Sequence, residues 1–361
     1  MLQQKNLIIV HAFDHSACAF VRQHAFSVLA ECGMAGDFEI VRSRELINDD
    51  YLLAHTACVW ISRPFWPATA SFVEHYARKK GKHKFRIVAD FDDLLWDVGG
   101  ENFMTDYNKA PVDTTVTARC IEGFAPKLDA VILSTEWLRR CWLARFKDAC
   151  KKVAVVGNAI PRFLWGKAEP KKALPKKPVV LYGGATVCHY NGDNTGDFTG
   201  DFTENWLEWI ASEKMEFHMF GDECPKWIGA KNVVMHPTVG AWQFPDAVRS
   251  IKPDLYIAPL KDNPFNRAKS NLKLLEASAL GVPFVSSWWE KFCPYSESAV
   301  RITPETEPAA FIDGLRDPET FRAVVDYQTD LMESRGYWLE SRIYRDKLLR
   351  VLLGDFLRIE G

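Results

Sequence analysis

The stretch from Asp254 to Pro283 combines an apolar run, a polar loop and an amphipathic segment. Leu255 to Ala258 is typical of a buried strand, and Lys269 to Leu280 has apolar residues at helical spacing that predict a helix. Helix N-termini bind anions well, because their unpaired N–H groups and the helix dipole both favour negative charge. A strand, a loop and a helix in this order therefore predict a site for a phosphate.

The polar residues of this loop are suited to that chemistry. We expect Asn266, Lys269 and Ser270 to line the anion site, with Lys269 supplying a positive charge. Glu276 follows about two helical turns later, where its carboxylate would accept a hydrogen bond from a sugar hydroxyl. The alternative is a helix that packs on a sheet beside a solvated loop.

A second polar group consists of Asp90, Asp92 and Asp93, which follow the apolar run from Phe85 to Ala89. Three carboxylates within four residues repel one another, so they need helix caps, cationic partners or a function in binding. We predict that Asp92 or Asp93 orients or deprotonates an acceptor hydroxyl, and that Asp90 contacts the acceptor.

Apolar strands alternate with amphipathic helices in both halves of the chain, which predicts doubly wound, largely parallel α/β sheets. In the first half the predicted strands are Asn6–Ala12, Cys58–Ser62, Phe85–Asp90, Ala130–Ser134 and Val153–Val156, and the predicted helices are Ala17–Glu31, Thr69–Lys79 and Glu136–Phe146. In the second half the predicted strands are Val179–Tyr182, Glu216–Phe220, Val233–Met235, Leu255–Ala258 and Phe284–Ser286, and the predicted helices are Phe202–Ser212, Ala241–Ser250, Lys269–Leu280 and Tyr337–Leu357. A segment rich in proline and lysine after Asn158 separates the halves and is interpreted as a linker.

Ligands of parallel α/β sheets bind beyond the carboxyl ends of the strands, so residues that follow a strand are further candidates. The additional candidates on the side of the phosphate site are Gly183, Gly184, His189, Gly221 and Asp222. Glycines there allow close approach of the backbone to a ligand. The candidates on the acceptor side are His11, His15, Arg22 and Trp96. The alternative for Arg22 is a salt bridge on a helix face.

The phosphate loop and its helix resemble the nucleotide-sugar site of GT-B glycosyltransferases, in a family-4-like branch of bacterial and phage enzymes. The shared pattern is FN-x-x-KS-x-x-K-x-LE-x-x-ALG-x-P, which begins here at Phe265 and ends at Pro283. Two further motifs of that branch have counterparts, a D-x-DD-L-W stretch from Asp90 to Trp96 and a G-G…H stretch from Gly183 to His189. The larger family-4 enzymes carry a Glu, seven residues and a second Glu. Here Glu276 is the second, and Ala268 stands at the first position.

The resemblance implies a GT-B fold, in which two Rossmann-like domains enclose a cleft and the final helix crosses back onto the first domain. It implies that Phe265 joins the donor site, that a nucleotide-diphosphate sugar is the co-substrate, and that no cofactor or metal is needed. It also implies retention of anomeric configuration. We assign residues 1–160 to an acceptor domain, 161–177 to the linker, 178–335 to a nucleotide-sugar domain and 336–361 to the crossing helix.

Composition bears on the compartment and on the acceptor. A formal net charge of −2 and a charged fraction of 25% do not demand a nucleic acid or an anionic membrane as partner. The nine cysteines form no CxxC pair and are typical of reduced thiols, and no apolar run is long enough to span a membrane. The first residues lack the pattern of a signal peptide. We expect a cytoplasmic monomer or homodimer in a bacterium or a phage-infected cell.

Two classes of acceptor fit these observations. One is a glycan or lipid-linked intermediate of a bacterial envelope. The other is a hydroxymethylated pyrimidine in phage DNA, which would have to flip out of the duplex. The basic run from Ala77 to Arg86 precedes a strand and lies away from the predicted cleft, so we interpret it as a solvated face. A third hypothesis, prompted by Ala268, is a non-catalytic sugar-nucleotide binding protein.

Overall fold

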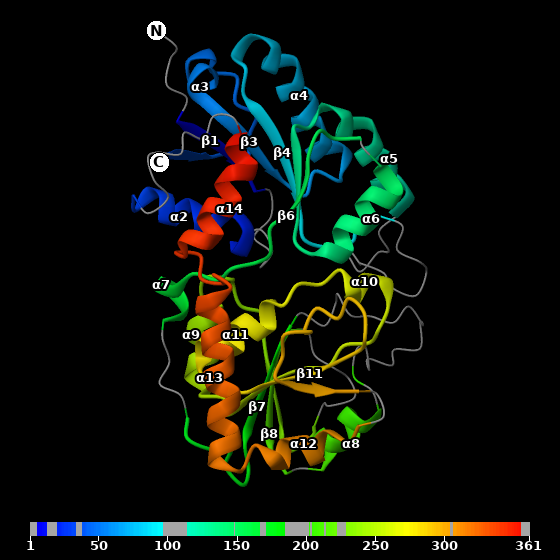
Figure 1. Ribbon diagram of the computed structural model, residues 1–361, viewed down its shortest axis with the longest axis vertical. Coiled ribbons are helices and arrows are strands. Elements are labelled where there is room, and N and C mark those ends of the chain that lie inside the picture. Colours follow the sequence, from blue (N-terminus) through cyan, green and yellow to red (C-terminus); the bar gives the residue numbers. More distant parts are fainter. Residues whose placement is uncertain are drawn as a thin grey trace.

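The structure is a computed structural model, and it describes residues 6–12, 20–33, 38–96, 114–147, 149–166, 171–184, 202, 204–212, 214–221, 229–303 and 306–354. Figure 1 shows two sheets, one above the other along the long axis of the molecule, each with helices around it. Within the described residues the first sheet has the order β2-β1-β3-β4-β5-β6 and the second the order β12-β11-β10-β7-β8-β9, and the strand pairs are parallel. Both orders are doubly wound, as predicted.

The first sheet contains β1 (Leu7–His11), β2 (Glu39–Arg42), β3 (Thr56–Ser62), β4 (Arg86–Phe91), β5 (Ala130–Leu133) and β6 (Val153–Val155). The helices of this part are a π-helical turn (Phe20–His24), α2 (Ala25–Glu31), α3 (Asp50–His55), α4 (Pro67–His83), α5 (Thr114–Phe124), a 3-10 turn (Ala125–Lys127), α6 (Glu136–Phe146) and α7 (Arg162–Trp165). The order of the strands reverses between β1 and β3. In open α/β sheets such a reversal marks the place where ligands bind.

The second sheet contains β7 (Val179–Gly183), β8 (Glu216–Phe220), β9 (Val233–His236), β10 (Leu255–Ala258), β11 (Phe284–Ser287) and β12 (Val300–Ile302). Its helices are α8 (Glu204–Ala211), α9 (Phe244–Ile251), α10 (Pro264–Arg267), α11 (Leu272–Leu280), α12 (Pro308–Gly314) and α13 (Pro318–Ser334). Here the order reverses between β7 and β10. The predicted phosphate loop follows β10 and therefore starts at this reversal.

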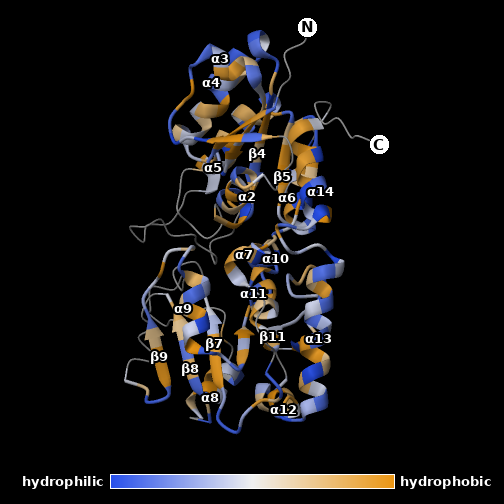
Figure 2. Ribbon diagram, turned by 90° about the vertical axis from the view of Figure 1, so that its left-hand side faces the viewer, coloured by the Kyte–Doolittle hydropathy of each residue, from blue (hydrophilic) through white to orange (hydrophobic). Residues whose placement is uncertain are grey.

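Alternate residues of the strands fill opposite sides of each sheet, as the two-residue period of a strand requires. In β1, Leu7 and Ile9 pack in one core while Ile8 and Val10 pack in another. In β7, Leu181 lies on the side opposite Val180. Figure 2 shows strands that are mainly apolar and outer helices that carry both polar and apolar residues. Burial on both faces explains why the strands appear in the sequence as continuous apolar runs.

The final helix, α14 (Arg342–Leu353), returns to the first sheet, which confirms the crossing that the resemblance implied. Leu348 and Leu352 are fully buried in the same core as Ile8 and Trp60. Arg86 of β4 donates through Nε to the carbonyl oxygen of Leu352, at 3.1 Å. It thereby supplies a hydrogen-bond partner to one of the last carbonyl groups of α14, which have none within the helix. Figure 1 shows α13 along the second sheet and α14 along the first.

The helix predicted to begin at Lys269 begins instead at Leu272. Asn263 caps a separate short helix, α10, because its side chain accepts from the N–H of Asn266 at 2.7 Å. Residues 268–271 link the two helices and are not an N-terminal turn. The helices α3 and α5 and the strands β2 and β12 are further elements that the sequence pattern did not predict.

Candidate functional site

The carboxyl ends of the two sheets meet at an ion pair between Asp93 and Lys269. Asp93 follows β4 of the first sheet, and Lys269 belongs to the loop after β10 of the second sheet. Lys269 Nζ lies 2.9 Å from Asp93 Oδ1, and the two side chains are 20% and 11% exposed. Lys269 also lies over the Phe265 ring, 4.3 Å from its centroid. The structure thus brings together three residues that the sequence placed on the two sides of one site.

Arg63 completes this group and was not among the predicted residues. Its Nε donates to Asp92 Oδ1 at 2.5 Å and its Nη2 donates to Asp93 Oδ2 at 2.6 Å. The residue directly follows β3 and has a φ of 41°, in the left-handed region that a residue other than glycine rarely adopts. Its place after a strand was the available signal in the sequence. Arg63 and Lys269 together neutralise the two carboxylates, whose mutual repulsion had demanded partners.

Asp90 and Arg22 form a buried pair behind this group. Arg22 donates to Asp90 Oδ1 through Nε at 3.0 Å and Nη2 at 2.8 Å, and the side chains are 3% and 2% exposed. Burial raises the pKa of Asp90, and the Arg22 charge opposes that shift. Trp60 donates to the other carboxylate oxygen at 3.1 Å. The predicted acceptor contacts at Arg22 and Asp90 are therefore corrected to internal, structural ones, because neither side chain reaches the surface.

The pair extends across the boundary between the sheets. Arg22 Nη1 donates to Asn158 Oδ1 at 3.1 Å, and Asn158 Nδ2 donates to Ser270 Oγ at 2.7 Å. Ser270, predicted to bind phosphate, thus holds the loop between β10 and α11 to the end of the first domain. This loop, residues 259–271, contains the predicted phosphate loop and is called the donor loop below. Asn158 lies shortly after β6, directly before the predicted linker.

His11 and Trp96 are also interior residues. The His11 ring is fully buried, with Nε2 2.7 Å from Tyr76 Oη and Nδ1 2.8 Å from the carbonyl oxygen of Ser43. Burial lowers its pKa to about 4. Trp96 has no exposed surface and packs edge-on against Trp142, with ring centroids 5.6 Å apart. Neither can contact an acceptor in this arrangement, which corrects both predictions. His15 lies outside the described residues.

The donor loop docks on the first domain. Phe265 and Ala268 are buried in the core formed by one side of the first sheet. Thr135 Oγ1 donates to the carbonyl oxygen of Ala268 at 3.3 Å, and Trp137 Nε1 donates to that of Pro264 at 3.0 Å. A glutamate at position 268 would bury its carboxylate in this apolar core. An alanine at this position therefore fits the way in which the loop packs.

Asn266 shapes the loop. It is 2% exposed, and its Nδ2 donates to the carbonyl oxygen of Lys261 at 2.9 Å. The side chain thus closes the turn between β10 and α10. Asn266 thus lies in the predicted loop, and its side-chain amide forms its hydrogen bond within that loop.

Glu276 lies inside the second domain beneath the loop. Tyr256 Oη donates to Glu276 Oε2 at 2.6 Å, and burial raises the pKa of Glu276 to about 7. A Cβ on Gly183 would lie 2.2 Å from Tyr256 Oη and 2.9 Å from the Phe244 ring. Gly183 is thus required by the close approach of Tyr256, a reason that the sequence did not reveal. Glu276 is 7% exposed, so its predicted contact with a sugar hydroxyl stays a prediction.

A second cation lies near the glycines. Lys273, in the first turn of α11, extends over the Tyr182 ring at 5.6 Å from its centroid. A Cβ on Gly184 would lie 3.4 Å from Lys273 Cε. Lys273 belonged to the matched pattern without being assigned to the site. Gly221 directly follows β8 and has a φ of 128°, and its N–H donates to the carbonyl oxygen of His236 at 3.1 Å. His189 and Asp222 lie outside the described residues.

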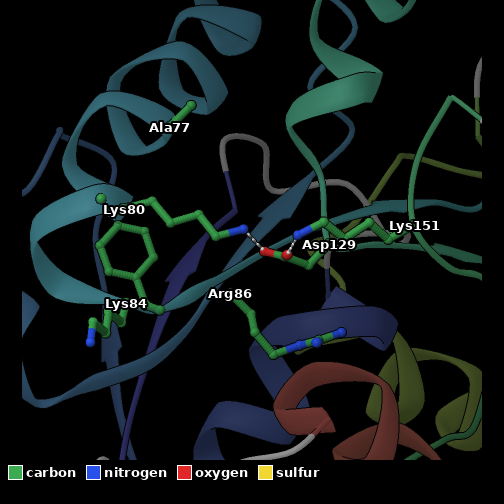
Figure 3. Close-up of a pocket in the computed structure, with 8 residues that line it drawn as sticks. Ala77, Lys80, Lys84, Arg86, Asp129 and Lys151 are labelled. Carbon is green, nitrogen blue, oxygen red and sulfur yellow. Dashed lines mark hydrogen bonds and ion pairs between the residues drawn. The ribbon is translucent and has the colours of Figure 1, made fainter.

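A separate hollow of about 540 Å³ lies at the amino ends of β4, β5 and β6, away from the ion pair and beside the basic run of α4. Figure 3 shows Lys80 and Lys151 reaching Asp129 from two sides, the second at 2.8 Å. Asp129 Oδ2 also accepts from the N–H of Ile87, at 2.9 Å. Arg86 points toward α14 and caps its end. These charges serve the fold, so this hollow is not the candidate site.

Among the described residues, no group of three or more His, Cys, Asp or Glu side chains is placed to hold a metal ion. Asp90 in β4 and the carboxylates Asp92 and Asp93 after it are paired with Arg22, Arg63 and Lys269. None of the helices in the part of the chain that the structure describes is both long and apolar enough to cross a membrane.

No family model and no curated protein sequence matches this chain. Its fold is similar to that of several solved structures at low sequence identity. Sucrose-phosphate synthase from Thermosynechococcus elongatus is 14% identical with a TM-score of 0.53, over 96% of this chain and 94% of that chain. Anabaena Alr3699/HepE in complex with UDP and glucose is 10% identical with a TM-score of 0.57, over 96% and 98%. OtsA is 13% identical with a TM-score of 0.50, over 84% and 73%.

The first two of these similarities extend over 96% of this chain. Together with the two parallel six-stranded sheets of the described residues, they show that this protein has the GT-B fold.

Proposed function

We propose that this protein is a glycosyltransferase that moves a sugar from a nucleotide-diphosphate sugar to a hydroxyl group. The observation that carries the proposal is the ion pair between Lys269 and Asp93. It places a cation suited to a diphosphate beside a carboxylate suited to a hydroxyl, where the strand ends of the two domains of a GT-B fold meet.

The donor in this proposal is a UDP-sugar. Two of the similar structures are of Anabaena Alr3699/HepE, one in complex with UDP and glucose and one with UDP-glucose. In this chain the donor would contact Lys269, the backbone of the loop after β10 and the glycines after β7. We retain His189 and Asp222 in the proposed donor site, since both follow strands of the second sheet.

The proposed chemistry is electrostatic. Lys269 and Lys273 would balance the charge that develops on the departing diphosphate, and preorganised charges of this kind often supply the largest part of catalysis. Asp93, or Asp92 beside it, would orient or deprotonate the acceptor hydroxyl. We propose that the reaction proceeds with retention and without a metal ion or other cofactor.

The proposed acceptor is a glycan or lipid-linked intermediate of a bacterial envelope, modified in the cytoplasm. Residues 1–160 would bind it, and residues 178–335 would bind the donor. The net charge of −2 supports this choice over duplex DNA, whose binding usually relies on many basic contacts. The alternative of a non-catalytic sugar-nucleotide binding protein, prompted by Ala268, predicts that the donor binds without turnover on any acceptor.

A mass-spectrometric assay of product formation tests the proposal. The wild type is incubated with UDP-sugars and either envelope glycan acceptors or hydroxymethylated DNA. Lys269→Ala should lower transfer at least ~100-fold, the effect typical of losing one preorganised group, while the circular dichroism spectrum stays unchanged. Lys347→Ala, which removes an exposed lysine of α14, is the matched control and should keep full activity. Full activity in the Lys269 variant would show that the donor site lies elsewhere.

A further inference from the structure

Asp93 uses both oxygens of its carboxylate to bind cations from two different domains. Oδ1 accepts from Lys269 at 2.9 Å across the boundary, and Oδ2 accepts from Arg63 at 2.6 Å within the first domain. The neighbouring Asp92 binds the Nε of the same guanidinium at 2.5 Å. Arg63 is therefore shared by the two carboxylates, while Lys269 is brought to Asp93 by the second domain.

A carboxylate held in this way is poorly placed to serve an acceptor. Oδ1 and Oδ2 each accept from a cation, and little of the group is open to solvent, because Asp93 and Arg63 are each 11% exposed. A base must lie within hydrogen-bond reach of the hydroxyl whose proton it takes. In this arrangement a hydroxyl has to compete with Lys269 and Arg63 for the carboxylate of Asp93.

Lys269 is the partner that a donor can remove. Arg63 and Lys269 carry two positive charges and Asp92 and Asp93 carry two negative ones, so the group is neutral as it stands. A diphosphate that arrives at the donor loop adds negative charge and offers Lys269 several oxygens. The diphosphate would therefore compete with Asp93 for the charge and the N–H groups of Lys269, whereas Arg63 is also anchored on Asp92.

We infer that Lys269 is exchanged between Asp93 and the donor diphosphate, so that donor binding releases Asp93 to receive the acceptor hydroxyl. This inference rests on the proposed function and adds an order of binding to it, the donor first and the acceptor second. Arg63 is a positioning residue in this scheme: it holds Asp93 in place by Oδ2 while Oδ1 is exposed. Before the donor binds, the ion pair blocks the acceptor side.

The transfer step balances as follows in chemical terms. The acceptor oxygen bonds to the anomeric carbon, and the bond from that carbon to the diphosphate oxygen breaks with its electron pair left on the diphosphate. The proton of the acceptor hydroxyl moves to Asp93 Oδ1, and Lys269 balances the charge of the leaving diphosphate. Departure of the product diphosphate returns Lys269 to Asp93, which expels the proton to solvent.

Calorimetric titration with UDP alone tests the exchange without any acceptor. If Asp93 competes with UDP for Lys269, Asp93→Asn should bind UDP about tenfold more tightly than the wild type, and Lys269→Ala about tenfold more weakly, which corresponds to about 1.4 kcal/mol in each direction. Asp92→Asn is the matched control. It removes a negative charge from the neighbouring residue, whose carboxylate binds Arg63 and not Lys269. Its affinity for UDP should stay within about threefold of the wild type. Asp93→Ser, which removes the same carboxylate, repeats the measurement should Asp93→Asn fold poorly.

The outcomes separate the exchange from the function on which it rests. Weaker binding by Lys269→Ala together with unchanged binding by Asp93→Asn and Asp93→Ser would overturn the exchange and leave the donor site in place. Equal tightening in the Asp92 and Asp93 variants would also overturn it, since a general change of charge would then be the cause. Absence of binding of UDP and other nucleoside diphosphates to the wild type would instead reject the proposed function.

Discussion

Replacing Arg22 by methionine tests whether the residue holds the first domain together or contacts a substrate. Methionine retains much of the apolar stem and removes the guanidinium, which donates to Asp90, to the carbonyl oxygen of Val156 at 2.6 Å and to Asn158. Asp90 would remain 2% exposed, with the indole of Trp60 as its side-chain donor. Removal of one partner from a buried ion pair costs about 3–5 kcal/mol, because the other charge is left without compensation. We expect the free energy of unfolding to fall by that amount.

Urea unfolding of four proteins isolates the pair. The set is the wild type, Arg22→Met, Asp90→Asn and the double variant, with circular dichroism and tryptophan fluorescence as probes. Because the asparagine no longer needs a cation, the double variant should be more stable than the sum of the single losses predicts. We expect an interaction energy of at least about 2 kcal/mol. Arg316→Met, which breaks an exposed pair with Asp313, is the control and should cost less than about 1 kcal/mol.

The stability lost in Arg22→Met should change with pH in a direction that can be measured. Burial already raises the pKa of Asp90, and loss of Arg22 removes the main opposing charge. An acid whose pKa is higher in the folded state binds more protons when folded, so stability falls as the pH rises toward that pKa. The cost of Arg22→Met should therefore grow as the pH rises above the ordinary pKa of an aspartate. A variant that unfolds at the wild-type urea concentration and loses only transfer activity would refute the structural interpretation and return Arg22 to the acceptor site.

Two further changes follow from burial in the second domain and in its loop. The pKa of Glu276 is raised to about 7 by burial, so wild-type stability should fall between pH 4.5 and 7 and level off above that, and Glu276→Gln should flatten the slope. Urea midpoints at each pH measure this, and an unchanged slope would show that Glu276 titrates normally. Ala268→Glu should lower the free energy of unfolding by at least about 2 kcal/mol, because position 268 is fully buried against the first domain. Ala68→Glu on the exposed start of α4 is its control, and equal stability of the two variants would contradict the packing argument.

The architecture was largely predictable because it depends on local patterns. Strands β8 and β10 and helix α6 have the bounds that the apolar spacing predicted. Elements that lack a continuous apolar signal were missed: β2 lies at a sheet edge and is not buried, and α10 is one turn long and is defined by the Asn263 cap. These depend on neighbours or on a single side chain, which a periodicity does not record.

The candidate site was predictable only in part. Lys269, Asp92 and Asp93 were identified from their residue types and from their position after strands, and the structure brings them together. His11 ends β1, Trp96 follows β4 and Arg22 lies in the turn before α2, yet all three side chains are buried. Whether a polar side chain near a strand end turns toward a ligand or into the protein depends on the space around it, and the sequence does not contain that information.

The sequence by itself determined that this chain forms two parallel sheets, with acidic residues after one strand and a basic loop after another, because strand and helix periods and turn residues are local properties. The tertiary structure alone decided which charges meet. Arg63, Asp93 and Lys269 are far apart along the chain, and they form one group because the carboxyl ends of the two sheets face each other. The same docking places Ala268, which stands where the family-4 pattern has a glutamate, in an apolar core: the loop packs against the first domain, and such a core excludes an unpaired carboxylate.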